Sequence, residues 1–128
     1  MNIVNILIVV DTLSAASTGN LKDNVYLIDT EKYLGSWNEG LCDLHTLTED
    51  GQLIKWSVTS ITPENSVEIA EFSGPMINLK TCIPKKQGIE GDIFWEGRVE
   101  ASPGRYSYTL ALNIQGEIMT FSPYIEVQ

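Results

Sequence analysis

The apolar and polar positions along the chain follow the pattern of short β-strands separated by turns. The most apolar segment is residues 2–12, in which Ile6 to Val10 leave no polar position on either face. Val and Ile are restricted at χ1 in a way that suits a pleated strand, and about ten residues without a preceding cap is short for a helix. We therefore expect a central strand that is covered on both faces.

Later segments alternate with the period of two that is typical of a half-buried strand. The alternation is clearest in residues 52–61 and 92–100, where it places Trp56 and Trp95 on the apolar side and so in the core. Further strands are expected at residues 24–28, 42–48, 67–70, 106–114 and 118–127.

Turn and loop signals separate these strands. Asp50-Gly51 and Gln115-Gly116 are expected to close hairpins, because glycine adopts positive φ without strain. Pro123 interrupts the last strand and predicts a bulge or a change of sheet partner. Small and polar residues predict surface loops at 13–20 and around Lys85-Lys86.

Eight or nine short strands without an amphipathic helix predict an all-β fold, a single antiparallel β-sandwich formed by residues 1–128. A partly closed β-barrel is the alternative. A chain of 128 residues buries enough surface for one hydrophobic core without disulfides.

Charge and cysteine content narrow the function classes. The net charge of −9 argues against nucleic acid and against a membrane surface as partners, since both require a basic patch. The N-terminal segment has no basic residue before it and contains Asn5 and Asp11, so we do not expect a signal peptide. We expect a cytoplasmic protein in which Cys42 and Cys82 are free thiols.

Candidate catalytic chemistry is sparse. The sequence has no glycine-rich phosphate loop and no Cys/His cluster, and we expect neither cofactor nor metal. Asp43 and His45 share one strand face, which leaves open a hydrolase that uses them as base and orienter, although an exposed histidine is the simpler interpretation. At Asp11, capping of backbone N–H groups is favoured over catalysis.

A binding site is a stronger alternative. Residues 29–40 are expected to form a loop that carries aromatic, amide and carboxylate groups of the kind that sandwich lectins use. The candidate ligand-binding residues are Tyr33, Trp37, Asn38 and Glu39.

Three segments, Ile6 to Thr12, Gly51 to Ile61 and Phe121 to Val127, together resemble the AidA/PixA family of bacterial inclusion-body proteins in their order and spacing. Ser122 departs from the family pattern, in which an aspartate is common. The matching positions, which we expect to be structural, are Asp11, Thr12, Gly51, Lys55, Trp56, Pro123 and Tyr124.

This resemblance implies a β-sandwich and an abundant, non-enzymatic protein with a storage role or a role linked to cell density or host association. The strand at 106–114 adds an argument of its own for self-association. It is long and uncharged after Arg105, and Ser107, Thr109 and Ala111 leave its second face small. We expect this strand to mediate a homo-oligomer, most simply a dimer.

Overall fold

The computed structural model describes residues 3–19, 21–29, 44–62 and 66–128, which form eleven strands and three short helical segments. The strands are β1 (Val4–Val10), β2 (Val25–Asp29), β3 (His45–Thr48), β4 (Leu53–Ser60), β5 (Val67–Ser73), β6 (Lys85–Ile89), β7 (Asp92–Arg98), β8 (Gly104–Ser107), β9 (Thr109–Ile114), β10 (Glu117–Phe121) and β11 (Tyr124–Val127). The helical segments are α1 (Thr12–Thr18), the 3-10 helix η1 (Lys22–Asn24) and α2 (Pro75–Asn78).

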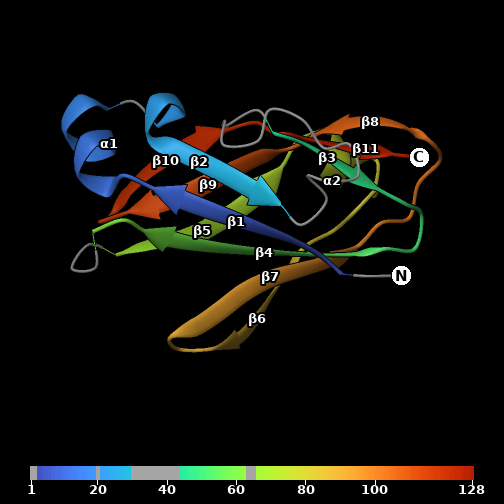
Figure 1. Ribbon diagram of the computed structural model, residues 1–128, viewed down its shortest axis with the longest axis horizontal. Helices are drawn as coiled ribbons and strands as arrows, with labels where there is room; N and C mark the ends of the chain where they lie inside the picture. Colours follow the sequence, from blue (N-terminus) through green and yellow to red (C-terminus); the bar gives the residue numbers. More distant parts are fainter. Residues whose placement is uncertain (1–2, 20, 30–43, 63–65) are drawn as a thin grey trace.

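The strands form one five-stranded sheet, in the order β2-β1-β4-β7-β6, and two three-stranded sheets, β10-β9-β5 and β3-β11-β8 (Figure 1). All three sheets contribute to one hydrophobic cluster. The all-β, sandwich-like class predicted from the sequence is confirmed, and in the described residues no sheet closes into a barrel. Two pairs, β1 with β4 and β3 with β11, are parallel. Alternation did not show this, because it reports which face a side chain takes and not the direction of the neighbouring strand.

Strand β1 is central, as expected, since it lies between β2 and β4. The expectation that both of its faces are covered is wrong. Val4, Ile6, Ile8 and Val10 are buried, whereas Leu7 on the other face is 39% exposed. The second layer covers only one side of the five-stranded sheet. The apolar run of β1 therefore has one buried face and one partly exposed face.

A helix stands where the sequence predicted a loop. Helix α1 begins after Asp11, whose Oδ1 accepts a hydrogen bond of 3.2 Å from the Ser14 N–H. It ends at Gly19, which has a φ of +69° and donates its N–H to the Ala15 carbonyl. This capping is the contact expected of Asp11, and together with the glycine stop it supports seven residues of modest helix propensity.

The turn at Asp50-Gly51 is present but does not close a hairpin. The Gln52 N–H bonds to the Glu49 carbonyl at 3.1 Å, and Gly51 has a φ of +88°. However, β3 and β4, which the turn joins, belong to different sheets, so the predicted hairpin is wrong. By contrast, the hairpin at Gln115-Gly116 is confirmed, because β9 and β10 pair antiparallel.

The long strand predicted at 106–114 is divided at Tyr108 into β8 and β9, opposite the division between β10 and β11. At this point the Tyr108 N–H bonds to the Pro123 carbonyl at 3.1 Å. The predicted change of sheet partner at Pro123 is confirmed, since β10 pairs with β9 whereas β11 pairs with β3 and β8. Strand β9 is paired along both edges, with β10 and β5, so self-association through this strand is left with its outer face.

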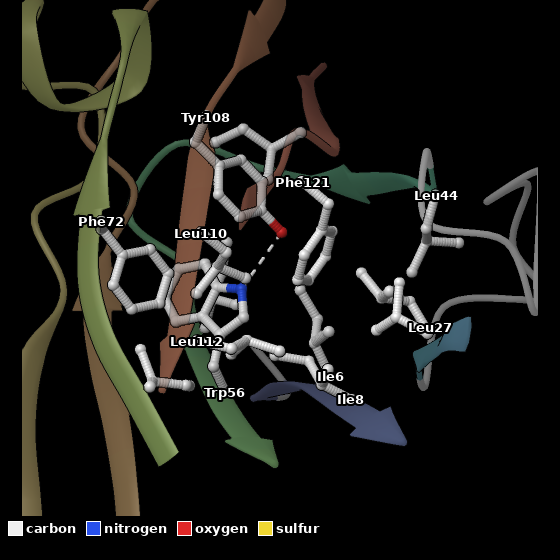
Figure 2. Packing of buried hydrophobic residues seen from close by; sticks show 14 of the residues in the cluster. Ile6, Ile8, Leu27, Leu44, Trp56, Phe72, Tyr108, Leu110, Leu112 and Phe121 are labelled. Carbon is white, nitrogen blue, oxygen red and sulfur yellow. Dashed lines mark hydrogen bonds between the residues drawn. The ribbon is translucent and has the colours of Figure 1, made fainter. Parts of the chain in front are cut away.

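Among the described residues, Trp56 is the largest of the fully buried side chains, and its indole N–H donates a hydrogen bond of 3.2 Å to the Tyr108 hydroxyl across the core (Figure 2). Phe72 packs edge-on against Trp56, with ring centroids 5.0 Å apart. The core position predicted for Trp56 is therefore confirmed. Trp95 packs against the core but is only half-buried, because it lies where β7 leaves the body of the sandwich.

The two tryptophans are expected to differ in their effect on stability. Trp56→Ala should lower the free energy of unfolding by about 3–5 kcal/mol, because it leaves a large cavity and an unpaired tyrosine hydroxyl. Trp95→Ala should cost at most about half as much, since solvent already reaches part of its ring. Urea denaturation followed by far-UV circular dichroism measures both, and equal losses would contradict the burial described above.

Candidate functional site

The candidate ligand-binding residues Tyr33, Trp37, Asn38 and Glu39 lie outside the described residues, as do Cys42 and Asp43. His45 is described, and it is buried at the start of β3. Its ring stacks on that of Tyr124, with centroids 4.5 Å apart. The expectation of an exposed histidine is wrong, because the parallel pairing of β3 with β11 places Tyr124 beside it.

The residues that carry the family resemblance make contacts within the fold. Thr12 is buried and its hydroxyl lies 2.9 Å from that of Ser60, which joins the start of α1 to the end of β4. The Gly51 N–H bonds to the Val99 carbonyl at 2.7 Å. The ammonium of Lys55 lies 4.2 Å from the centre of the Phe94 ring, in a cation–π contact on the outer face of the five-stranded sheet.

The described structure contains a groove of about 430 Å³, and no sequence motif pointed to it. The β4–β7 ladder ends at the pair Trp56 and Trp95, beyond which the two strands separate. The end of β4, the start of β5 and the far end of the β6–β7 hairpin enclose the space between them. Its lining residues are Leu7, Ser57, Val58, Thr59, Val67, Glu68, Ile69, Lys86, Gly91, Asp92, Ile93 and Trp95.

The groove has an apolar wall with charged groups around it. Trp95 forms part of this wall and is held from behind by Phe72, whose ring centroid lies 5.3 Å from its own. Lys86, Glu68 and Asp92 add one positive and two negative groups. A concave volume, an aromatic surface and a few polar groups are features of small-molecule binding sites. The lining residues include no His or Cys.

The β6–β7 hairpin beside the groove forms the lower margin of the molecule in Figure 1. All five residues of β6 are exposed, and Ile89 at its end is 76% exposed. Gly88 has a φ of +92°, and a Cβ at this position would lie 2.1 Å from the Asp92 carbonyl oxygen. A glycine is therefore required at this position of β6, where the backbone of β7 approaches closely.

Sequence reasoning missed β6, because Pro84, two lysines and a positive-φ glycine all favour a loop. The interpretation of Lys85-Lys86 as a loop is wrong, although both side chains are exposed as expected. A signal was present in Glu90-Gly91, a two-residue turn that joins β6 to a strand whose alternation had been recognised.

No metal or nucleophilic site emerges from the described residues. Among them, no group of three or more His, Cys, Asp or Glu side chains is placed to hold a metal ion. Cys82 is a free, buried thiol, and its Sγ would lie 2.7 Å from a Cβ added at Gly97. Burial, with a smaller contribution from the charge of Glu100, raises the pKa of Cys82 to about 12, so this thiol stays protonated at neutral pH.

Cys82 should make the protein less stable in alkali. Its pKa rises from an ordinary value of 9.0 to about 12 on folding, so between these values the unfolded chain releases its proton while the folded chain keeps it. The free energy of unfolding should fall as pH rises through this range, and the contribution is fully present below pH 9. Urea denaturation from pH 8 upward should show a shallower decline for Cys82→Ala, and identical slopes would contradict the assignment.

Comparisons with known proteins agree with the fold. The model of a family described as a domain of unknown function, DUF8788, matches residues 2–120. No curated protein sequence matches the chain significantly. The crystal structure of an inclusion body protein, PixA, from Burkholderia cenocepacia superposes with a TM-score of 0.71 at 15% identity, over 98% of this chain and 93% of that one.

A cysteine protease inhibitor from Entamoeba histolytica reaches a TM-score of only 0.36 at 13% identity, over 66% of this chain and 84% of the other, and carries no argument. The similarity to PixA confirms the sequence-based resemblance at the level of the fold. In the described residues no helix is long and apolar enough to cross a membrane.

Proposed function

This chain belongs to the DUF8788 family, and we propose that it is a non-enzymatic, PixA-like inclusion-body protein that assembles with copies of itself. The observation that carries the proposal is the turn end of the β6–β7 hairpin. There an edge strand whose side chains are all exposed, with Ile89 76% exposed, and a 41% exposed Ile93 lie next to the groove. Edge strands and exposed apolar groups are the features through which β-proteins associate.

Two further observations support this function. The fold is that of a protein described as an inclusion body protein, although at 15% identity the likeness concerns the fold alone. The net charge of −9 gives copies of the chain a mutual repulsion, which favours an ordered contact at one place over indiscriminate aggregation. Storage in a cytoplasmic inclusion is the role that we propose, and the buried free thiol of Cys82 suits a reducing compartment.

Sedimentation equilibrium tests self-association. In moderate salt the mass should rise above 14.2 kDa, the mass of one chain, as protein concentration increases into the range of about 1–100 μM. Raising the salt concentration should change the apparent affinity, because charges surround the proposed contact. A mass that stays at one chain throughout this range would overturn the proposal.

The groove itself favours a second candidate function, that of a module that binds a small ligand. A half-buried Trp95 with carboxylates, hydroxyls and one ammonium around it offers the aromatic surface and the hydrogen-bonding groups that a saccharide site uses. The interpretation needs no residue of the segment 30–43, in which the sequence had suggested a ligand patch.

A glycan array followed by tryptophan fluorescence titration tests this second candidate. A saccharide that binds in the groove should shift the emission of the native protein and should lose most of its affinity to Trp95→Ala. Leu13→Ala, at an exposed position outside the groove, is the control. Saturable binding that is unchanged in Trp95→Ala would place the ligand elsewhere.

A further inference from the structure

We propose that the β6 strands of two copies pair antiparallel about a two-fold axis, joining two five-stranded sheets into one continuous ten-stranded sheet. The inference rests on the proposed self-association and names the surface and the geometry through which it occurs. Its partner is a second copy of this chain.

Strand β6 is available for such pairing. It lies at the end of the five-stranded sheet, its ladder partner among the described residues is β7, and all five of its side chains are exposed. In an antiparallel ladder, alternate residues direct their N–H and C=O groups away from the partner strand. Among the described residues no strand pairs with these outward groups of β6, which is the arrangement that strand addition uses.

The charges of the hairpin select the antiparallel direction. Lys85 and Lys86 stand at the start of β6, and Glu90 follows its end. A parallel contact between two β6 strands places lysine beside lysine. The antiparallel contact instead brings the basic start of each strand to the acidic end of the other. The two-fold axis then repeats the same lysine–glutamate contact at both ends of the strand pair. Lysines commonly protect edge strands from pairing, and here they disfavour the parallel contact, in which the lysines of the two copies adjoin.

Within the hairpin, Lys86 is the better placed of the two lysines to make this contact. Lys85 faces Glu96 across the β6–β7 ladder and so already has an acidic neighbour. Lys86 faces Trp95, which is neutral, on the side of the sheet that lines the groove. Lys86 lies near the start of β6 and Glu90 in the turn that follows its end, so an antiparallel partner strand brings the Lys86 of each copy toward the Glu90 of the other.

The proposed contact closes on itself. A two-fold dimer consumes the β6 edge of both copies, so growth through this edge stops at two chains. The strand that the sequence suggested as the contact, β9, is paired on both edges and has only its outer face, with the half-buried Ala111, to offer. The two surfaces are therefore separable by mutation.

A charge exchange tests the inference. Lys86→Glu and Glu90→Lys should each weaken the dimer about tenfold in sedimentation equilibrium, because each creates two like-charge contacts. The double variant, Lys86→Glu with Glu90→Lys, should restore the affinity to within about threefold of the parent, since every contact is again between opposite charges. The matched controls Lys80→Glu and Glu117→Lys make the same changes in net charge at exposed positions outside β6 and should leave the affinity within about twofold.

The outcomes separate the two proposals. Weakening by the single changes and recovery in the double variant supports the inference, provided that circular dichroism shows all variants folded. A parent dimer that none of the β6 variants affects, or that Ala111→Lys breaks instead, overturns edge pairing through β6 and leaves self-association in place. A parent that sediments as one chain at all concentrations overturns the proposed function itself.

Discussion

The hydrogen bond between the indole N–H of Trp56 and the Tyr108 hydroxyl is the interaction on which the three sheets depend. Trp56 belongs to the five-stranded sheet, and Tyr108 stands at the break between β8 and β9, where the chain passes from one three-stranded sheet to the other. Both side chains are almost fully buried, so neither polar group has water as an alternative partner. Burial raises the pKa of Tyr108, so its hydroxyl stays neutral at physiological pH, and the indole N–H gives the buried oxygen a hydrogen-bond donor.

From this bond a row of aromatic rings reaches the surface. Phe72 packs against Trp56 on one side and Trp95 on the other, and Trp95 forms a wall of the groove. The base of the β6–β7 hairpin is thus fixed by the core, while its far end extends past the point where the β4–β7 ladder stops. An edge strand on a rigid base loses little conformational entropy when it pairs, which is why this end of the molecule suits a specific contact.

Much of the fold followed from local patterns, whereas the candidate site did not. The alternation of apolar and polar residues located most strands and the inward position of Trp56, and Pro123 marked a change of sheet partner. Both signals can be read from the sequence because they depend on the local backbone only. The groove draws its lining from β1, β4, β5, β6 and β7. No spacing in the sequence links Leu7 to Lys86 or Trp95. Candidate residues were therefore chosen by side-chain chemistry and local spacing, which favoured other positions, such as Asp43 with His45.

What the sequence determined by itself is the all-β class, the position of the central strand and the caps and turns that punctuate the chain. These depend on side-chain period, on χ1 restriction and on glycine and proline geometry, all of which are local. Tertiary structure decided which strands are neighbours and in which direction they run, and therefore that Gly51 joins two sheets, that β1 has one open face and that β9 is enclosed. It decided as well that β6 stands at an edge, because strand order is set by packing among segments distant in sequence.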